Sequence, residues 1–416
     1  MAGSVDVVVI GAGPYGLSLG AHLRSSGIDF RIFGEPMGAW KQNMPQGMIL
    51  KSYPWATNIY DTEASYAVKH FSEERGLPYS DCLMALSRET FVSYGEAFQS
   101  RFVPSVERKM LVSAEWEAGV ICARFDDGEI VRARRMVLAV GLSAFKYTPT
   151  IVERLPSDLL SHSADYGPLE GLAGKRVAVI GSGSSATDLS ALLHEQGTEV
   201  SLITRSANLE FASPPRPRGL VERALAPTGA IGNGWTMGIC ASAPSLVRLL
   251  PEELRVQLAY CRALGPLGGA FMKDRVIGKV RLCLGAEIER AVTRNGAVDL
   301  HLAGADDTRD VLTVDHVVSA TGYTADVKRL GFLSPQLVAH MRLTGTAPAL
   351  SYHYEASVPG LHFIGPAAAP SFGPVCRFVH GARHPARHLA KYLSMVLGRR
   401  AIPFINGRLA ESGALQ

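Results

Sequence analysis

The chain has 416 residues, of which 47% are hydrophobic and 19% charged, and its formal net charge at pH 7 is +4. These values describe a globular chain long enough for two domains, or for one domain that carries a large insertion. They exclude an intrinsically disordered chain, and the absence of a block of like charges argues against nucleic acid as a partner. No run of 18 apolar residues occurs, so we expect no membrane span.

The six cysteines contain no C-x-x-C pattern, and the two that lie closest in sequence are Cys240 and Cys261. This wide spacing favours reduced thiols and a cytoplasmic protein. It argues against a zinc site and against a paired redox centre.

The first predicted unit is a strand, a glycine turn and a helix. An apolar run from Val7 to Ile10 stops at Gly11-x-Gly13-x-x-Gly16, after which leucines recur at helical spacing. Gly11 permits the turn, Gly13 allows a pyrophosphate to approach the backbone, and Gly16 allows the helix to lie close to the strand. A second strand, 28–33, is followed by Glu35, at the place where an acid suits a ribose hydroxyl. The pattern predicts a dinucleotide site.

The next hundred residues contain less regular elements. A loop with Trp40 and an irregular stretch with Thr57 and Asn58 precede a predicted helical region, 64–102. Short strands follow at 109–112, 120–125, 130–131 and 136–140, with a hairpin turn at 126–128. The last of these runs is continuous and apolar, which predicts a central parallel strand ending at Gly141.

The opening unit then recurs. After a connector, 142–173, a strand at 176–180 leads into Gly181-x-Gly183-x-x-Ala186, a helix and a further strand, 200–205. Arg205 follows Gly181 at the same spacing at which Glu35 follows Gly11. An arginine there suits a 2′-phosphate, so this second site is predicted to prefer NADPH, and the alternative is a solvated strand end.

The remaining chain is predicted to form a helical insertion over the dinucleotide domains and then to complete the first domain. Residues 208–275 are interpreted as a helical insertion, with a loop at 213–218 and amphipathic helical pieces from 246 to 264. Strands are predicted over 276–318 and 361–365, and a helix from 375 to about 397, which Pro385 interrupts. His380, His384 and His388 share one face of that helix, but no carboxylate or cysteine accompanies them and we assign no metal.

Two dinucleotide turns, the second inserted before the first domain is complete, resemble the two-dinucleotide-binding flavoproteins over nearly the whole chain. Four further features resemble their class B monooxygenases, the flavin-containing monooxygenase and N-hydroxylase group. They are the H-S-x-x-Y of 162–166, the D-x-x-x-x-A-T-G-Y of 315–323, the Thr-Asn pair of 57–58 and the G-x-W ending at Trp40. Ser319 replaces the usual Leu or Phe. The F-x-G that precedes H-S-x-x-Y in the family would fall at Pro156 and Asp158, so that half of the fingerprint is missing. This and the absent W-P/D after His162 argue against a Baeyer–Villiger enzyme. The middle segment and 372–378 are similar to bacterial FAD-dependent urate-hydroxylase-like proteins.

The resemblance implies an α/β fold with two Rossmann-like domains, in which the NADPH domain and its helical insertion are inserted into the FAD domain. The implied division is 1–160 and 324–416 for FAD and 161–323 for NADPH. The expected cofactor-binding residues are Gly11, Gly13, Pro14, Tyr15, Gly16, Glu35, Trp40, Thr57, Asn58, Gly141, Gly181, Gly183, Ser184, Ser185, Thr204, Arg205, Thr321, Gly322, Tyr323, Gly365 and Gly373.

The resemblance further implies an NADPH-dependent FAD monooxygenase that oxygenates a small molecule through a C4a-(hydro)peroxyflavin, with nitrogen or sulfur as candidate positions. Asn58 is the candidate near the flavin, and its alternative is a loop-stabilising role. Arg377 is the candidate for holding a substrate anion or peroxide, and its alternative is a surface salt bridge. The competing function is an NAD(P)H oxidase or reductase without oxygenation. The expected partners are the substrate and O2, and a homo-oligomer stays open.

Overall fold

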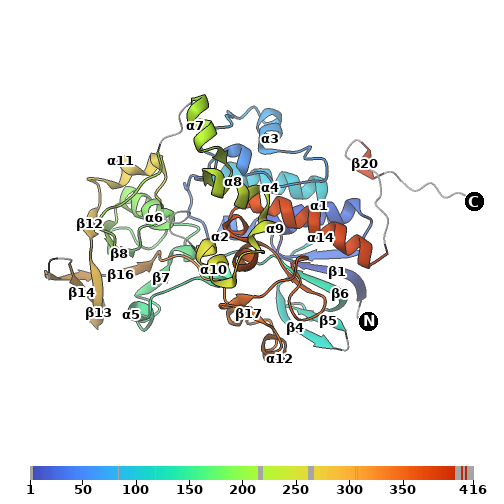
Figure 1. The fold of residues 1–416 in the computed structure, drawn as a ribbon. Coiled ribbons are helices and arrows are strands. Elements are labelled where there is room, and N and C mark those ends of the chain that lie inside the picture. Colours follow the sequence, from blue (N-terminus) through green and yellow to red (C-terminus); the bar gives the residue numbers. More distant parts are fainter. Residues whose placement is uncertain are drawn as a thin grey trace, which may run out of the picture.

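The computed structural model describes residues 3–82, 84–117, 119–213, 219–260, 267–304, 306, 308–398, 404–405 and 408–409. Two sheets organise this part of the chain, a mixed one at one side of Figure 1 and a parallel one at the other. The mixed α/β class predicted from the sequence is confirmed. No helix among the described residues is both long and apolar enough to cross a bilayer.

The first sheet is built from N-terminal strands and one late strand. Its order is β3-β2-β1-β6-β5-β4, and β19 pairs with β6. The strands β3, β2, β1, β6 and β19 are parallel, whereas β4, β5 and β6 form an antiparallel meander. The bounds are β1 (Gly3–Ile10), β2 (Phe30–Phe33), β3 (Val106–Glu107), β4 (Leu111–Glu117), β5 (Val120–Phe125), β6 (Ile130–Leu138) and β19 (Leu361–Phe363).

The second sheet is entirely parallel, in the order β12-β9-β8-β16-β7. A three-stranded antiparallel sheet, β13-β14-β15, lies beside it. The bounds are β7 (Leu160–His162), β8 (Arg176–Ile180), β9 (Glu199–Thr204), β12 (Arg281–Leu284), β13 (Glu287–Arg294), β14 (Ala297–Ala303), β15 (Arg309–Val314) and β16 (His316–Ser319).

Helices flank both sheets, and several short ones lie between them in Figure 1. The helices are α1 (Pro14–Ser25), α2 (Gly38–Gln42), α3 (Val68–Glu74), α4 (Arg88–Phe102), α5 (Thr150–Glu153), α6 (Ser184–Glu195), α7 (Leu220–Leu225), α8 (Trp235–Ser242), α9 (Pro244–Val247), α10 (Glu252–Tyr260), α11 (Lys273–Val276), α12 (Pro335–Ala339), α13 (Ala369–Phe372) and α14 (Arg383–Val396). Short hairpins join β10 (Thr228–Gly229) to β11 (Gly232–Asn233), β17 (Leu343–Thr344) to β18 (Ala347–Pro348), and β20 (Phe404–Ile405) to β21 (Arg408–Leu409).

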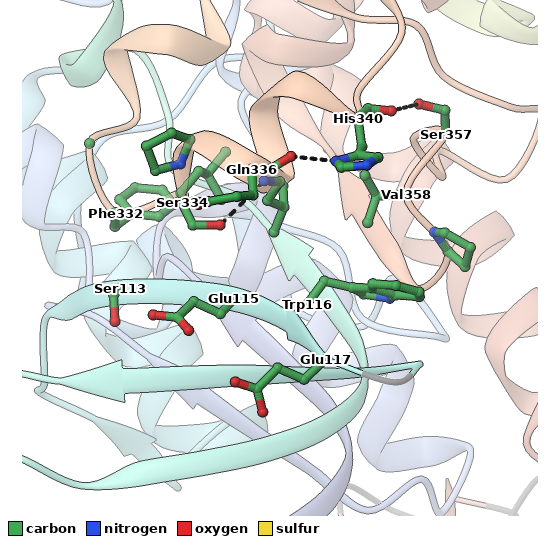
Figure 2. Close-up of a pocket in the computed structure, with 15 residues that line it drawn as sticks. Ser113, Glu115, Trp116, Glu117, Phe332, Ser334, Gln336, His340, Ser357 and Val358 are labelled. Atoms are coloured by element: carbon green, nitrogen blue, oxygen red, sulfur yellow. Dashed lines mark hydrogen bonds between the residues drawn. The ribbon is translucent and has the colours of Figure 1, made fainter.

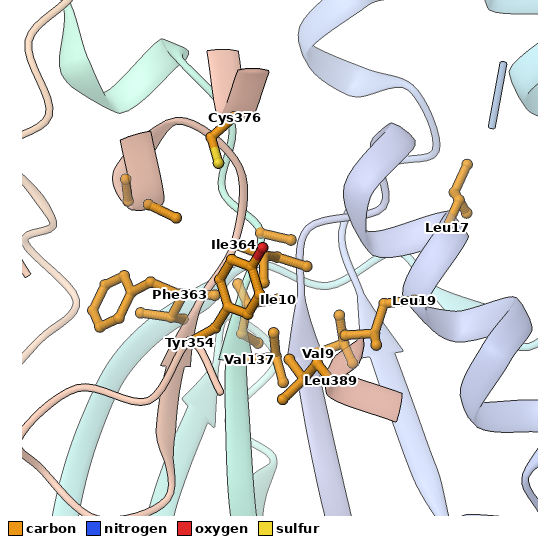
Figure 3. Packing of buried hydrophobic residues seen from close by; sticks show 14 of the residues in the cluster. Val9, Ile10, Leu17, Leu19, Val137, Tyr354, Phe363, Ile364, Cys376 and Leu389 are labelled. Atoms are coloured by element: carbon orange, nitrogen blue, oxygen red, sulfur yellow. The ribbon is translucent and has the colours of Figure 1, made fainter. Parts of the chain in front are cut away.

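The largest core cluster joins the first sheet to the two long helices α1 and α14. Figure 3 shows Val9 of β1 and Val137 of β6 beside Leu389 of α14, with Leu19 of α1 nearby. All four side chains are fully buried. Full burial of such a side chain contributes about 1.5–3 kcal/mol, so both faces of the β1 region are tightly held and the turn that follows β1 is fixed in place.

Two expected helices have different bounds in the structure. The single helical region predicted over 64–102 is wrong, because α3 and α4 are separate and Gly76 adopts a positive φ of 62° between them. The helix predicted from Val375 is also wrong. Two 3₁₀ turns, Pro374–Arg377 and Val379–Ala382, occupy its first part, and α14 begins at Arg383. Pro385 therefore lies in the first turn of α14, where it interrupts no hydrogen bond.

Smaller differences affect the strands and the insertion. The runs 130–131 and 136–140 belong to one strand, β6. The helical stretch predicted over 246–264 is divided into α9 and α10, and Pro251 stands between them. Residues 261–264 of that prediction and 214–218 of the predicted loop lie outside the described residues.

Candidate dinucleotide and active site

The first glycine turn has the geometry that its sequence predicted. Gly11 has a φ of +112°, and a Cβ there would lie 2.3 Å from the carbonyl oxygen of Ala139. A Cβ on Gly16 would lie 1.8 Å from the carbonyl oxygen of Gly11, so helix and turn touch through backbone atoms. A Cβ on Gly13 would meet no atom within 4 Å. The turn is therefore closed on the protein side and open where a ligand would approach.

The N-terminus of α1 gives the open side of this turn a positive electrostatic potential. Gly13 is the N-cap, Pro14 occupies the first turn, and no side chain caps the helix. Unpaired N–H groups and the positive end of the helix dipole are the donors that a diphosphate requires. Gly141, after β6, has a φ of +71° and is likewise open within 4 Å of its would-be Cβ.

Glu35 follows β2 at the same edge of the sheet. Its carboxylate pairs with Lys41 at 2.5 Å and with Arg108 at 3.5 Å, and about a third of its side chain is exposed. The carboxylate is therefore accessible and oriented by two cations. Its role toward a ribose hydroxyl stays a prediction.

Trp40, Thr57 and Asn58 are engaged with the protein itself. The Trp40 ring packs edge-on against Phe91 with centroids 4.6 Å apart, and the Thr57 hydroxyl donates to the carbonyl oxygen of Tyr53 at 2.8 Å. The Asn58 amide donates to the carbonyl oxygen of Trp55 and accepts from the backbone N–H of Val68, both at 2.9 Å. These two bonds favour the loop-stabilising alternative for Asn58, and its place near a flavin stays a prediction.

The second glycine turn repeats the first. Gly181 has a φ of +146°, and a Cβ there would lie 2.4 Å from the carbonyl oxygen of Ala320. Gly183 is the N-cap of α6 and, like Gly13, provides no side-chain cap. The Ser184 hydroxyl donates to the carbonyl oxygen of Leu267 at 3.1 Å, and Ser185 follows in the first turn. This turn therefore offers the same kind of anion-binding edge.

Arg205 lies one residue beyond the end of β9. Its side chain is exposed, and it has no ion-pair partner among the described residues. The neighbouring Thr204 is buried, and its hydroxyl accepts from the N–H of Ser206 at 3.1 Å, so it fixes the turn. Within the described part of the chain, no carboxylate therefore competes with a phosphate for Arg205.

The H-S-x-x-Y and A-T-G-Y segments contact each other. His162 accepts the N–H of Ala164 at its Nδ1 atom, which leaves Nε2 to donate to the carbonyl oxygen of Gly322 at 3.1 Å. The His162 ring lies edge-on to Tyr323, and burial lowers the pKa of His162. The Thr321 hydroxyl donates to the carbonyl oxygen of Tyr147 at 2.5 Å. A neutral His162 thereby orients this linker between the two sheets.

The C-terminal segment meets the first turn through Tyr15. Gly365 has a φ of +80° and a Cβ there would lie 3.6 Å from the Tyr15 ring. The Tyr15 hydroxyl lies 2.9 Å from the carbonyl oxygen of Cys376 and 2.8 Å from that of Phe378, and shares its one proton between them. This phenol therefore fixes the backbone on both sides of Arg377. Gly373, four residues earlier than Arg377, also has a positive φ, of 86°.

Arg377 is mostly withdrawn from water and makes no surface salt bridge with the described residues, so that alternative is wrong. Its guanidinium donates to the carbonyl oxygen of Ala259 in α10 at 3.2 Å. Burial lowers the pKa of Arg377, with Tyr260 acting in the opposite direction, and no carboxylate in the described ranges pairs with it. A half-buried cation without a counter-ion is a group that an anionic ligand would complete.

The histidines of α14 and a buried aspartate were not assigned roles from the sequence. His384 stacks on His388, and His388 on His353, with centroids 5.3 and 5.1 Å apart. Burial lowers the pKa of His384 to about 4. No metal-binding cluster is found among the described residues. In α6, burial raises the pKa of Asp188 to about 7.

A cavity of about 820 Å³ lies away from these residues. Figure 2 shows it between β4, which contributes Glu115, Trp116 and Glu117, and the segment that carries His340. None of the site residues predicted from the sequence lines it, so we do not assign the dinucleotide sites to this groove.

Comparisons with known proteins agree with the two-turn geometry. A family model described as pyridine nucleotide-disulphide oxidoreductase matches residues 5–229, more than half of the chain. Indole-3-pyruvate monooxygenase YUCCA1 of Oryza sativa subsp. japonica is 29% identical over 324 residues, which cover 75% of this chain and 67% of the relative. The chain spans about half the length of other YUCCA monooxygenases that it matches.

Solved structures share the fold at low sequence identity. An ornithine N-hydroxylase from Kutzneria sp. 744 aligns with a TM-score of 0.74 and 18% identity, over 95% of this chain and all of that one. A flavin-containing monooxygenase from Stenotrophomonas maltophilia aligns with a TM-score of 0.65 and 19% identity, over 95% of this chain and 99% of that one.

The comparisons confirm the resemblance to class B flavin-dependent monooxygenases, the Rossmann-like α/β fold, the enzyme class, and FAD and NADPH as cofactors. The family model begins within the first strand and extends beyond the second glycine turn. The chain therefore belongs to the pyridine nucleotide-disulphide oxidoreductase family, among its flavin-dependent monooxygenases.

Proposed function

We propose that this chain is an NADPH-dependent FAD monooxygenase that transfers one oxygen atom of O2 to a small anionic substrate, and that the second oxygen atom leaves as water. The observation that carries the proposal is the pairing of two glycine turns with cysteines that are all free thiols in the described part of the chain. Two dinucleotide sites suit transfer of a hydride from NADPH to FAD, and no cysteine pair is present among those residues to pass electrons on.

Cys376 is the cysteine next to Arg377, the candidate substrate-binding residue, and it is unsuited to thiol redox chemistry. It is fully buried, and burial raises its pKa to about 12. Because the thiolate is the reactive form, this cysteine is inert at neutral pH. This argues against a thiol-dependent reductase and for a flavin that reacts with O2.

The residues around the first turn fit FAD. Gly13 leaves an open notch at the N-terminus of α1, where the diphosphate would be held by backbone N–H groups. Glu35, at the end of β2, would accept a ribose hydroxyl. When bound, FAD supplies the redox chemistry, since it accepts the hydride and activates O2. We propose 1–160 and 324–416 as its domain.

The residues around the second turn fit NADPH. Gly183 and Ser184 begin α6 as Gly13 and Pro14 begin α1. The exposed guanidinium of Arg205 would bind the 2′-phosphate by charge-assisted hydrogen bonds. We propose 161–323, with the helical insertion at about 208–275, as the NADPH domain.

Arg377 supports an anionic substrate. Its side chain is half-buried between the C-terminal segment and α10, and the Ala259 carbonyl satisfies only part of its donor capacity. A carboxylate or an ionised ring nitrogen would complete it and be oriented by it. The rice YUCCA1 relative is named for indole-3-pyruvate, a carboxylate, which agrees with this class.

The test measures NADPH, O2, hydrogen peroxide and product together, with a panel of small carboxylates and matched neutral amides. We expect an anionic substrate to accelerate NADPH oxidation and to lower the peroxide yield per NADPH. Arg377→Gln should raise the KM for that substrate about tenfold or more, and Arg377→Lys should raise it less. Stoichiometric peroxide with every compound would instead support the oxidase or reductase alternative. Equal KM changes for acids and amides would refute the role of Arg377.

A further inference from the structure

A second, smaller cavity lies where the helical insertion meets the C-terminal part of the first sheet's domain. It has a volume of about 350 Å³, and Arg248, Arg255 and Arg342 line it. Figure 1 shows the elements that frame it, α9, α10 and β17, close together at the centre of the molecule. None of the predicted cofactor or catalytic residues lines this cavity, which we call the arginine pocket.

The arginines of this pocket lack acidic partners. No ion pair within 4.0 Å joins any of the three to a carboxylate in the described part of the chain, although Glu252 and Glu355 also line the cavity. Glu355 is already engaged, because it accepts the N–H of Gly360 at 2.7 Å. The lining thus has three cationic and two acidic side chains.

One polar atom in the pocket has no partner. The Nε of Arg255 is buried and makes no hydrogen bond. Leaving such a charged donor unsatisfied is costly, so buried orphans in native proteins call for an unseen partner. Its Nη1 reaches the carbonyl oxygen of Arg248 only at 3.5 Å. The protein therefore satisfies the guanidinium of Arg255, which lines the cavity, only in part.

Arg248, the residue after α9, lies close to Arg255 of α10. Arg248 donates twice to the carbonyl oxygen of Leu350, at 3.0 and 2.8 Å, which fixes its guanidinium against the pocket wall. Burial and the neighbouring Arg255 both lower the pKa of Arg248. An anion bound between the two guanidinium groups would offset their repulsion.

We propose that the arginine pocket is a binding site for a small oxyanion, the carboxylate or phosphate group of a metabolite, separate from both dinucleotide sites. Arg255 and Arg342 bind the anion, Arg248 adds to the positive potential, and the Ser351 and Ser371 hydroxyls line the same cavity. Such an anion also steadies α10, because Ala259, whose carbonyl holds Arg377, lies one helical turn after Arg255.

The test is isothermal titration calorimetry of FAD-loaded protein saturated with NADP⁺, so that both dinucleotide sites are filled. The probes are inorganic phosphate and, separately, succinate, at an ionic strength kept constant with NaCl. All proteins carry Arg377→Gln, which removes the candidate substrate site from the measurement. We expect one binding event for at least one probe, and the probe that binds identifies the oxyanion.

Arg255→Gln should weaken that binding about tenfold or more, since it removes a charge-assisted donor pair. The Arg342 side chain is exposed, so Arg342→Gln should leave the fold intact and weaken anion binding as well. Arg255→Lys should weaken anion binding less than Arg255→Gln does. Arg124→Gln removes an equal charge from the exposed face of β5 and should change nothing. No binding of either probe, or equal affinity in Arg255→Gln, Arg342→Gln and Arg124→Gln, would overturn the proposal.

Discussion

Gly13→Ala should weaken FAD binding while leaving the fold intact. Gly13 has a φ of −85°, which any L-residue adopts, and its would-be Cβ meets no protein atom within 4 Å. The fold should therefore accept alanine, with a gain of about 0.4–1 kcal/mol from the less flexible unfolded chain. The added methyl group occupies the place where the diphosphate approaches the backbone. Overpacking of this kind costs about 1–3 kcal/mol, which corresponds to a loss of about 5- to 150-fold in FAD affinity.

Gly16→Ala is the matched control, with the same added methyl group in the same turn. Its Cβ would lie 1.8 Å from the carbonyl oxygen of Gly11, so the backbone itself must move. We expect this variant to lower the free energy of unfolding of the apoprotein by about 2 kcal/mol or more. The larger Gly13→Val should yield folded apoprotein.

Two measurements on each variant decide the matter. Urea unfolding of the apoprotein gives the stability, and quenching of FAD fluorescence on reconstitution gives the affinity. If Gly13→Ala binds FAD within a factor of two of the natural chain, the first turn does not hold the diphosphate and the assignment of this site is refuted.

Three further outcomes test the remaining geometry. Arg205→Ala should lower kcat/KM for NADPH about 10- to 100-fold and for NADH less than threefold, and equal losses would exclude the 2′-phosphate role. Tyr15→Phe should lower the free energy of unfolding by about 1–2 kcal/mol and raise the substrate KM, whereas Tyr147→Phe, at an exposed ring, should change neither. The free energy of unfolding should fall as pH decreases from about 6.5 to about 4, because buried neutral histidines bind fewer protons than they do in the unfolded chain. A flat profile over that range in urea unfolding would contradict the burial of His362, His380 and His384, whose pKa values are lowered to about 4.

The two glycine turns could be predicted because their requirements are local. Gly11 and Gly181 have positive φ values and lie against the backbone that follows a neighbouring strand. Glycine meets both requirements because it has no Cβ. The spacing to Glu35 and Arg205 follows from a strand, a helix and a strand of ordinary length. These spacings are set within one strand–helix–strand unit, which a sequence pattern records, whereas the backbone atoms closest to Gly11 and Gly181 belong to Ala139 and Ala320, much later in the chain.

The environments of the candidate catalytic side chains could not be predicted in the same way. Asn58 bonds to the N–H of Val68, which the sequence pattern placed within a helix rather than at its start. The C-terminal helix begins later than predicted because Phe378 has an extended backbone, with φ −115° and ψ 155°, which separates the two 3₁₀ turns. The arginine pocket joins α10 to a segment far along the chain, around Arg342 and Ser351, and no local pattern connects them.

Tyr15 shows how the two ends of the chain form one site. It belongs to the glycine turn by sequence, yet its hydroxyl bonds to carbonyl groups near the other end of the chain, on both sides of Arg377. The turn that we assign to FAD and the cation that we assign to the substrate are therefore held by one half-buried phenol. Because Arg377 is also bonded to α10, its position depends on the insertion as well as on the first domain. Changes in the insertion should thus alter the choice of substrate while leaving both glycine turns intact.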